Sequence, residues 1–254
     1  DGSPDNTEQF LDNESIKIPN LKVINQENSG PAAARNNGVN HANSDIIAFT
    51  DDDCIVDHDW IENILNEFED NSVKVLEGLT YTNKELRTPF THQIENLKWN
   101  PVIPTCNAAY RKDFFQEIGG FDESFPFPHN EDTDLAWRVL STTSVKFCEN
   151  MKVYHPPITV KFKSQLKRMR MLVSEFFLYK KNKSAYKKWR TSNPWITIYK
   201  EVFFKHQLLN LKFHLGFYRK PVLLVKGIAL SIGWWLYLII LLPKFVTESY
   251  SVRG

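Results

Sequence analysis

The sequence predicts an α/β fold, a sheet with flanking helices, followed by a C-terminal helical region that associates with a membrane. Short apolar runs alternate with segments of helical periodicity through the first 157 residues. Residues 1–160 hold 27 acids against 12 Lys and Arg, whereas residues 161–220 hold 16 Lys and Arg against two acids. Residues 222–242 carry one charge, Lys226, and are long enough to cross a bilayer once.

The first elements follow from helix caps and apolar spacing. We expect an opening helix and then a short strand over residues 21–24. Ser29 as N-cap and Pro31 at the first helical position predict a helix that runs to about Ala42. The continuous apolar run within residues 45–50 predicts a strand that is buried on both faces.

The same alternation continues along the chain. An amphipathic helix begins near Asp59, and further helices are expected over residues 111–118 and 131–140. Gly119 and Gly120 would end the first of these two helices. Strands are expected over residues 73–82, 145–148 and 153–155, the last two at a sheet edge. Because helices and strands alternate, we expect a parallel sheet.

Three consecutive acids, Asp51, Asp52 and Asp53, follow the predicted buried strand. Like charges ~4 Å apart repel by about 4 kcal/mol at an effective dielectric of 20, so we expect a cation beside them. If the backbone stays extended, Asp51 and Asp53 point the same way and can share one Mg²⁺ or Mn²⁺. A solvated turn is the alternative. An EF-hand loop is excluded because Ile55 and Val56 stand where that loop needs a ligand and a glycine.

A second group of acids, Glu131, Asp132 and Asp134, lies at the start of a predicted helix. Acids in the first helical turn are favoured by the helix dipole by about 0.3–1 kcal/mol each, so a charged first turn is one interpretation. The other is functional, since one acid group could hold a metal while the second supplies a general base.

Several short segments form an ordered set that covers residues 1 to about 160. They are DGS at 1–3, NSGPAAARNNG at 28–38, FTDDD at 49–53, NAAYR at 107–111, GGFDE at 119–123, EDTDLAWR at 131–138 and VYH at 153–155. This set resembles the inverting glycosyltransferases of family 2, which have the GT-A fold. The resemblance implies a GT-A, Rossmann-like nucleotide-diphospho-sugar transferase sheet with flanking helices.

The resemblance implies a donor site that holds a nucleotide sugar and a divalent cation, Mn²⁺ or Mg²⁺. Asp51, Asp53 and His155 match metal positions, and Asp53 is the expected direct ligand. The residues that match donor-binding positions are Asp1, Arg35, Asp51 and Asp52. The alternatives are a surface helix charge for Arg35 and the end of an edge strand for His155.

The resemblance also implies an acceptor side of the site. Asp132 matches the catalytic base. Glu131 and Asn107 match acceptor-binding positions, with a turn hydrogen bond as the alternative for Asn107. Asp134 and Arg138 are four residues apart on a helix and are expected to form a structural ion pair.

The implied activity is metal-dependent transfer of a sugar, with inversion, from a UDP- or GDP-sugar to a glycan or lipid-linked hydroxyl acceptor. This is an EC 2.4, hexosyltransferase-like reaction of cell-surface glycan, polysaccharide or glycolipid synthesis. The family begins with a strand, a helix and a second strand that have no counterpart before Asp1, so an N-terminally truncated chain is expected. The alternative function is that of an inactive truncated remnant, acting only as a membrane-associated binding module.

Four regions are expected along the chain. They are a GT-A catalytic domain over 1–157, a basic interfacial helical segment over 158–220, a transmembrane or membrane-embedded helix over 221–243 and a tail over 244–254. Within the basic segment, Gln165-x-x-Arg168 is similar to the QxxRW motif of processive polysaccharide synthases, with Met169 in the Trp position.

Charge and cysteine content predict where the chain works. The Lys and Arg excess before the apolar segment places the catalytic part at the cytoplasmic face of the cell membrane, with the chain single-pass or peripherally anchored at its C-terminus. A buried or in-plane helix is the alternative to a spanning one. Cys54, Cys106 and Cys148 form no CxxC pair and indicate a reducing setting. We expect the basic segment to meet a membrane rather than nucleic acid, which is not an expected partner.

Overall fold

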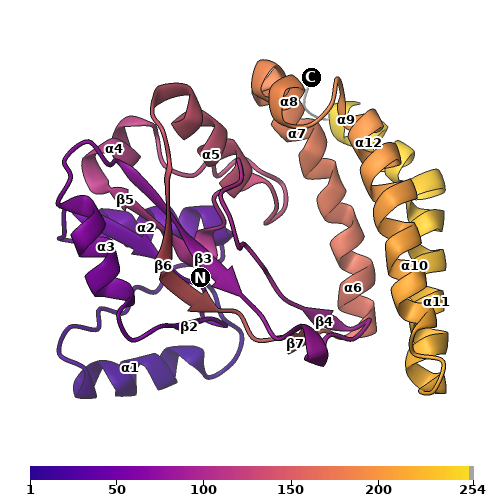
Figure 1. The fold of residues 1–254 in the computed structure, drawn as a ribbon, viewed down its shortest axis with the longest axis horizontal. Coiled ribbons are helices and arrows are strands. Elements are labelled where there is room, and N and C mark those ends of the chain that lie inside the picture. The colour runs from indigo at the N-terminus through magenta and orange to yellow at the C-terminus, as the bar shows by residue number, and fades with distance from the viewer. Residues whose placement is uncertain (252–254) are drawn as a thin grey trace.

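The computed structural model describes residues 1–251, so the last three residues of the expected tail lie outside the described part. Figure 1 shows two parts side by side, a sheet with its helices and a group of long helices that carries the C-terminal half. The first part contains the segments from which a catalytic site was predicted.

The main sheet has five strands in the order β1-β5-β3-β6-β2. They are β1 Ile46–Phe49, β2 Ile55–Val56, β3 Val75–Tyr81, β5 Ala108–Arg111 and β6 Lys146–Tyr154. Of the paired strands, β3 and β6 run parallel, while β5 lies antiparallel between β1 and β3. The expected parallel sheet is therefore wrong, and the sheet is mixed. The physical reason is that residues 82–107 contain no α-helix, whereas a parallel neighbour needs a helical crossover.

Three local expectations also need correction. Residues 21–24 form no strand, because β1 and β2 are the edges of the sheet and neither pairs with them. The two expected edge strands, residues 145–148 and 153–155, are one strand, β6, which lies between β3 and β2. The N-cap of the next helix is Gly30 rather than Ser29, although Pro31 does occupy the first helical turn.

Five helices accompany the sheet: α1 Thr7–Lys17, α2 Pro31–His41, α3 Trp60–Phe68, α4 Lys112–Glu117 and α5 Glu131–Thr142. Helix α3 buries Trp60, Ile64 and Phe68, which recur at the expected helical spacing. Helix α4 ends as predicted, since Gly119 and Gly120 have φ values of 85° and 59° that favour glycine.

The remaining elements are mostly helical. They are α6 Phe162–Arg168, the 3₁₀ segment η3 Met169–Val173, α7 Ser174–Lys181, α8 Lys183–Trp189, α9 Pro194–Ile196, the π-helical η4 Thr197–His206, α10 Gln207–Leu215, α11 Pro221–Leu236, the π-helical η5 Tyr237–Leu241 and α12 Leu242–Ser251. A small second sheet pairs β4 Thr91–His92 with β7 Ile158–Thr159.

Two hydrophobic clusters show how the helices attach. Leu178 of α7 and Tyr186 of α8 belong to the same cluster as the buried residues of β1, β5 and α5. A second cluster joins η3 to the later helices and includes Met169, Ile198 and Leu238. Helices α7 and α8 therefore extend the core of the sheet-containing part, although they follow residue 157.

One helical stretch, Pro221–Lys244, is long and apolar enough to cross a membrane, with a mean hydropathy of 1.9. Of its most apolar window, 28% is buried inside the protein. Composition alone does not distinguish a span from a helix that lies on a surface.

Candidate active site

The triple acid follows β1 in a turn. The N–H of Cys54 donates to the carbonyl oxygen of Asp51 at 3.1 Å, so the backbone does not stay extended, which was the condition for Asp51 and Asp53 to point the same way. As a result, Asp51 and Asp53 face different partners, and Asp52 is exposed to solvent. Burial raises the pKa of Asp51, and the nearby charge of Arg35 opposes this increase.

Arg35 of α2 joins the two acid groups that the sequence separates. Its Nη2 lies 3.4 Å from Oδ1 of Asp51, and its Nη1 lies 3.1 Å from Oε1 of Glu131. The guanidinium also packs 5.5 Å from the ring centre of Phe121. The predicted donor and acceptor acids therefore lie on either side of one arginine.

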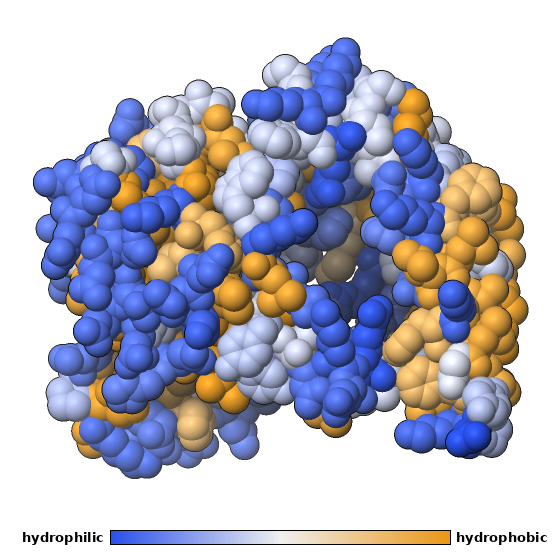
Figure 2. Space-filling model, viewed as in Figure 1, coloured by the Kyte–Doolittle hydropathy of each residue, from blue (hydrophilic) through white to orange (hydrophobic). Residues whose placement is uncertain are grey.

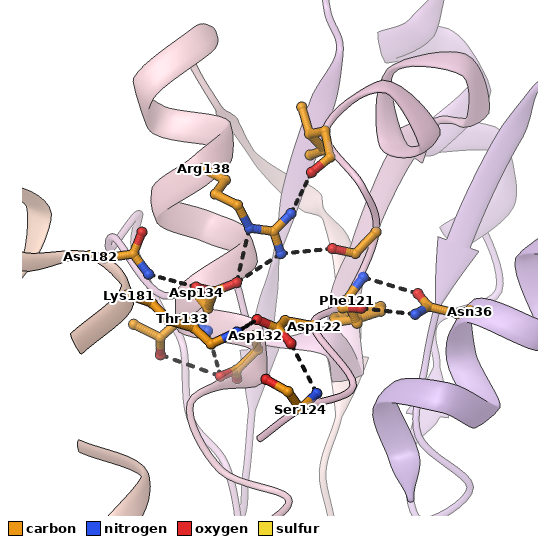
Figure 3. Close-up of polar contacts among 12 residues, drawn as sticks. Asn36, Phe121, Asp122, Ser124, Asp132, Thr133, Asp134, Arg138, Lys181 and Asn182 are labelled. Carbon is orange, nitrogen blue, oxygen red and sulfur yellow. Dashed lines mark hydrogen bonds and ion pairs between the residues drawn. The ribbon is translucent and has the colours of Figure 1, made fainter. Parts of the chain in front are cut away.

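Glu131 and Asp132 lie at the start of α5, after Asn130 in the left-handed conformation at φ 71°. Oδ1 of Asp132 accepts the backbone N–H of Thr133 at 2.7 Å (Figure 3). Burial, and secondly the charge of Glu131, raises the pKa of Asp132 to about 6. Oε2 of Glu131 is buried without a hydrogen-bond partner among the described residues, so it can receive a group from a bound molecule.

Asp53, Cys54 and His155 form a candidate metal site. Nε2 of His155 is 3.8 Å from Oδ1 of Asp53, and the ligand atoms of Asp53, Cys54 and His155 lie within 4.8 Å of one another. Nδ1 of the buried His155 is 3.1 Å from the carbonyl oxygen of Pro156, which fits Nδ1–H as donor and leaves Nε2 free to bind a metal. The carboxylate oxygens of Asp53 suit Mg²⁺ or Mn²⁺, and the imidazole adds a nitrogen ligand. Cys54 was not predicted, and no sequence spacing pointed to it.

Two further side chains surround this group and were missed as site residues. His92 of β4 packs edge-on against His155 with ring centres 5.6 Å apart. Nη2 of Arg168 lies 3.3 Å from Nε2 of His92. Burial, and secondly the charge of Arg168, lowers the pKa of His92 to about 4, so His92 is neutral at pH 7. The similarity of Gln165-x-x-Arg168 to a known motif was the available signal for Arg168.

Asp1 lines a cavity of about 510 Å³ that also touches Gly30 and Glu131. Its carboxylate accepts the backbone N–H groups of Ser29 at 2.8 Å and Gly30 at 3.1 Å. Asp1 thereby fixes the start of α2, the helix that carries Arg35. The cavity places Asp1 and Glu131 on one space that a donor could enter.

Asn107 lies in the interior, where all its side-chain polar atoms have protein partners. Its Oδ1 accepts the indole N–H of Trp60 at 2.9 Å, and its Nδ2 donates to the carbonyls of Leu79 and Met151 at 3.0 and 2.8 Å. A side chain on Gly78 would collide with it at 2.3 Å. These contacts tie β3 to β6, and they occupy the amide oxygen and nitrogen of Asn107 with protein partners.

The ion pair expected within α5 is confirmed. Nη2 of Arg138 lies 2.8 Å from Oδ2 of Asp134, and the guanidinium also donates to the carbonyls of Ile118 and Gly120 (Figure 3). Oδ1 of Asp134 accepts the amide of Asn182 from the helical part at 2.6 Å. These contacts hold the end of α4 and the α7–α8 junction against the helix that carries Asp132.

A larger cavity, about 1100 Å³, lies between α7 and the last helices. Its lining mixes charged, amide and aromatic side chains, among them Arg87, Glu175, Trp189, Arg190, Gln207 and Trp234. His129 also lines it and lies three residues before Asp132. Oε1 of the buried Gln207 has no hydrogen-bond partner among the described residues.

Comparison with known proteins places the chain in a family. Residues 1–119 match the family model described as glycosyl transferase family 2. The pre-mycofactocin glycosyltransferase of Mycobacterium tuberculosis is 30% identical over 136 residues, covering 47% of this chain and 28% of that protein. Glycosyltransferase AglE of Haloferax volcanii is 28% identical over 170 residues, covering 61% of this chain and 54% of AglE. The glucosyl-dolichyl phosphate glucuronosyltransferase of the same organism is 27% identical over 113 residues, covering 39% of this chain and 36% of that enzyme.

The chain spans about half the length, or less, of these curated relatives. Among solved structures, the mannosyltransferase PcManGT from Pyrobaculum calidifontis, in complex with GDP-Man and Mn²⁺, aligns with a TM-score of 0.53 and 17% identity over 94% of this chain and 75% of PcManGT. Staphylococcus aureus TarS 1-349 with UDP-GlcNAc aligns with a TM-score of 0.50 and 15% identity over 98% of this chain and 80% of TarS 1-349. These likenesses show a shared fold. With their matching motifs, residues 1–119 are identified as glycosyl transferase family 2 sequence, within a chain that has a GT-A-like mixed sheet.

Proposed function

We propose that this chain transfers a hexose-like sugar, with inversion, from a nucleotide-diphosphate donor to a hydroxyl acceptor. The observation that carries the proposal is the bridge from Asp51 through Arg35 to Glu131, which places a donor-binding acid close to the acid that precedes the half-buried Asp132. The product belongs to cell-surface glycan or glycolipid synthesis, and the reaction takes place at the cytoplasmic face of the membrane. The dolichyl phosphate substrate named for one relative supports a lipid-linked acceptor.

The donor end of the site is built from acids and one cation. Asp53 and His155 would hold Mn²⁺ or Mg²⁺, with Cys54 beside them. When bound, the metal neutralises charge that develops on the diphosphate leaving group. Arg35 supplies a second positive charge within reach of the same phosphates, and Asp1 lines the cavity for the nucleoside. The GDP-Man and UDP-GlcNAc of the structural neighbours support both donor classes.

Asp132 would act as the general base. As the acceptor oxygen forms its bond to the anomeric carbon, the bond from that carbon to the diphosphate breaks, and the acceptor proton passes to Asp132. Attack opposite the leaving group inverts the anomeric centre. With a pKa of about 6, Asp132 is mostly ionised at pH 7.5 yet basic enough to take the proton. Glu131 shapes the acceptor entrance, and the 1100 Å³ cavity, which His129 lines three residues before Asp132, offers room for a glycan.

The test compares Asp132→Asn with Asp12→Asn, an exposed aspartate of α1 that serves as matched control. Both proteins are assayed with Mn²⁺ for transfer and hydrolysis of GDP-mannose, UDP-GlcNAc and related donors. We expect Asp132→Asn to lower kcat by about 10²–10⁴-fold with little change in donor affinity, because it removes only proton transfer.

Equal kcat values in the two variants would overturn the role of Asp132. Failure of the unmodified chain with every donor, combined with intact binding to vesicles, would instead support the alternative of a membrane-associated binding module.

A further inference from the structure

The second half of the chain exposes a continuous apolar face on helices α11 and η5. Val222, Val225, Ile232, Leu236 and Ile239 are between 48% and 65% exposed. Their spacing of three, four or seven residues puts them on one side of the helix. We call these five residues the apolar stripe.

The neighbouring helix adds to this surface. Phe204 of η4 and Leu208 and Leu215 of α10 are each more than half exposed. Figure 2 shows hydrophobic residues gathered along the side of the molecule formed by α10 and α11, with isolated hydrophilic residues among them. Lysine and arginine are interspersed with the apolar residues, and the exposed ones are Lys205, Lys212, Arg219, Lys220 and Lys226.

The other sides of α11 are covered by protein. A side chain on Gly227 would approach His214 of α10 to 2.9 Å, and one on Gly233 would approach Leu166 of α6 to 3.1 Å. Nδ1 of His214 also lies 3.0 Å from Oγ of Ser231. Lipid can therefore reach α11 on the sides that α6 and α10 leave uncovered, which include the apolar stripe.

This packing argues against a transmembrane position. If α11 crossed a bilayer, η4 and α10 beside it would enter the hydrocarbon with Lys205 and Lys212, and α6 would bring Lys167. Each such charge costs at least about 2.5–3.5 kcal/mol at the bilayer centre. A helix pair that lies in the interface avoids this cost, because its lysines remain at the level of the headgroups.

We propose that the α10–α11 hairpin docks in the plane of an anionic lipid surface, with the apolar stripe inserted and the flanking lysines on lipid phosphates, and that it does not span the bilayer. The partner of this surface is lipid because the basic region 161–220 holds 16 Lys and Arg against two acids. This positive charge is complementary to anionic headgroups. The inference rests on the proposed membrane location and is independent of the transfer reaction.

The first test measures flotation of the full chain with vesicles of phosphatidylcholine, with and without phosphatidylglycerol. We expect binding only with the anionic lipid, weakened by salt. The double substitution Ile232→Glu and Ile239→Glu should reduce binding at least ten-fold, whereas Ile61→Glu, at an exposed site on α3, should not. Lys205→Gln with Lys212→Gln should weaken binding without adding charge to the stripe. Melting curves establish that each variant is folded.

A second measurement separates in-plane from spanning geometry. The variants Val222→Cys, Ile232→Cys and Ile239→Cys, each alone in a Cys54→Ala background, carry a fluorophore that is quenched by nitroxides at known lipid depths. A docked helix gives the same depth at all three positions, whereas a spanning helix separates the outer two by about 25 Å. A graded depth would overturn the proposal, as would equal binding to neutral vesicles or a dimer formed through the stripe. Donor hydrolysis in detergent reports separately on the proposed function.

Discussion

At the residue scale, a turn divides the triple acid Asp51, Asp52 and Asp53. Like charges in a row need a cation, which predicted one metal shared by Asp51 and Asp53, and the family resemblance added His155. The turn at Asp51 instead sends its carboxylate to Arg35, while Asp53 faces His155. A single backbone hydrogen bond therefore decides which acid can bind a metal directly, and residue order does not encode that bond.

The pKa of Asp132 gives a prediction at the same scale. Because a general base must be ionised, kcat/KM should fall below about pH 6, the pKa that burial and Glu131 impose on Asp132. Glu131→Gln removes the neighbouring negative charge, so the acid limb of the pH profile should move to lower pH. Rates measured between pH 5 and 8 with one donor test this. An acid limb that stays in place or moves upward would show that another group controls it.

At the scale of elements, a buried carboxylate on α7 supports the turn that precedes α5. Oε1 of Glu175 accepts the amide of Asn130 at 3.1 Å, and Oε2 accepts the hydroxyl of Tyr186 at 2.8 Å. Glu175→Leu leaves both donors without this acceptor, so it should lower the free energy of unfolding by about 1–3 kcal/mol or more. Tyr186→Phe removes the hydroxyl that contacts Glu175 and Thr197 but leaves the bond from Asn130 to Glu175 in place, so it should cost less. Chemical denaturation of the two variants makes the comparison, and the reverse order would contradict this role.

Strand β3 carries a second buried carboxylate with a different consequence. Burial raises the pKa of Glu77 from 4.5 to about 7, with Oε1 accepting from Asn96 at 2.8 Å. The folded state thus holds the proton more tightly than the unfolded state. The bound proton contributes about 3 kcal/mol to the free energy of unfolding. This contribution is fully present below pH 4.5 and is lost as the pH rises through about 7.

Glu77→Gln cannot lose a proton in this range. The free energy of unfolding of the unmodified protein should therefore fall relative to that of Glu77→Gln between pH 5 and 8. Urea titrations at several pH values measure the difference. A constant difference between the two proteins would show that Glu77 does not titrate with folding.

At the scale of the whole molecule, the structural features that could be predicted from the sequence are those formed by residues close together in the chain. The helix of Glu131–Thr142, its Asp134–Arg138 pair and the glycine end of α4 all follow from local spacing. The antiparallel direction of β5 does not, because it depends on a long irregular connection rather than on the strand itself. The pairing of β4 with β7 likewise brings His92 next to His155. The two histidines are far apart in the sequence, so no local pattern predicts this contact.

The shared core makes a prediction about the whole chain. Leu178 of α7 is fully buried in the cluster that contains Val75 and Leu135 of the sheet-containing part. Leu178→Ala should therefore cost about 2–5 kcal/mol, and it should lower the melting temperature of the catalytic part by roughly 4–20 °C. Calorimetry with and without UDP or GDP plus Mn²⁺ identifies the transition of the catalytic part, since a bound nucleotide raises its melting temperature.

Ile196→Ala on the partly exposed short helix α9 serves as control and should change this melting temperature little. If Leu178→Ala shifted only a separate transition that ignores nucleotide, the helices α7 and α8 would fold independently of the site, and the boundary at residue 157 would be a true domain boundary.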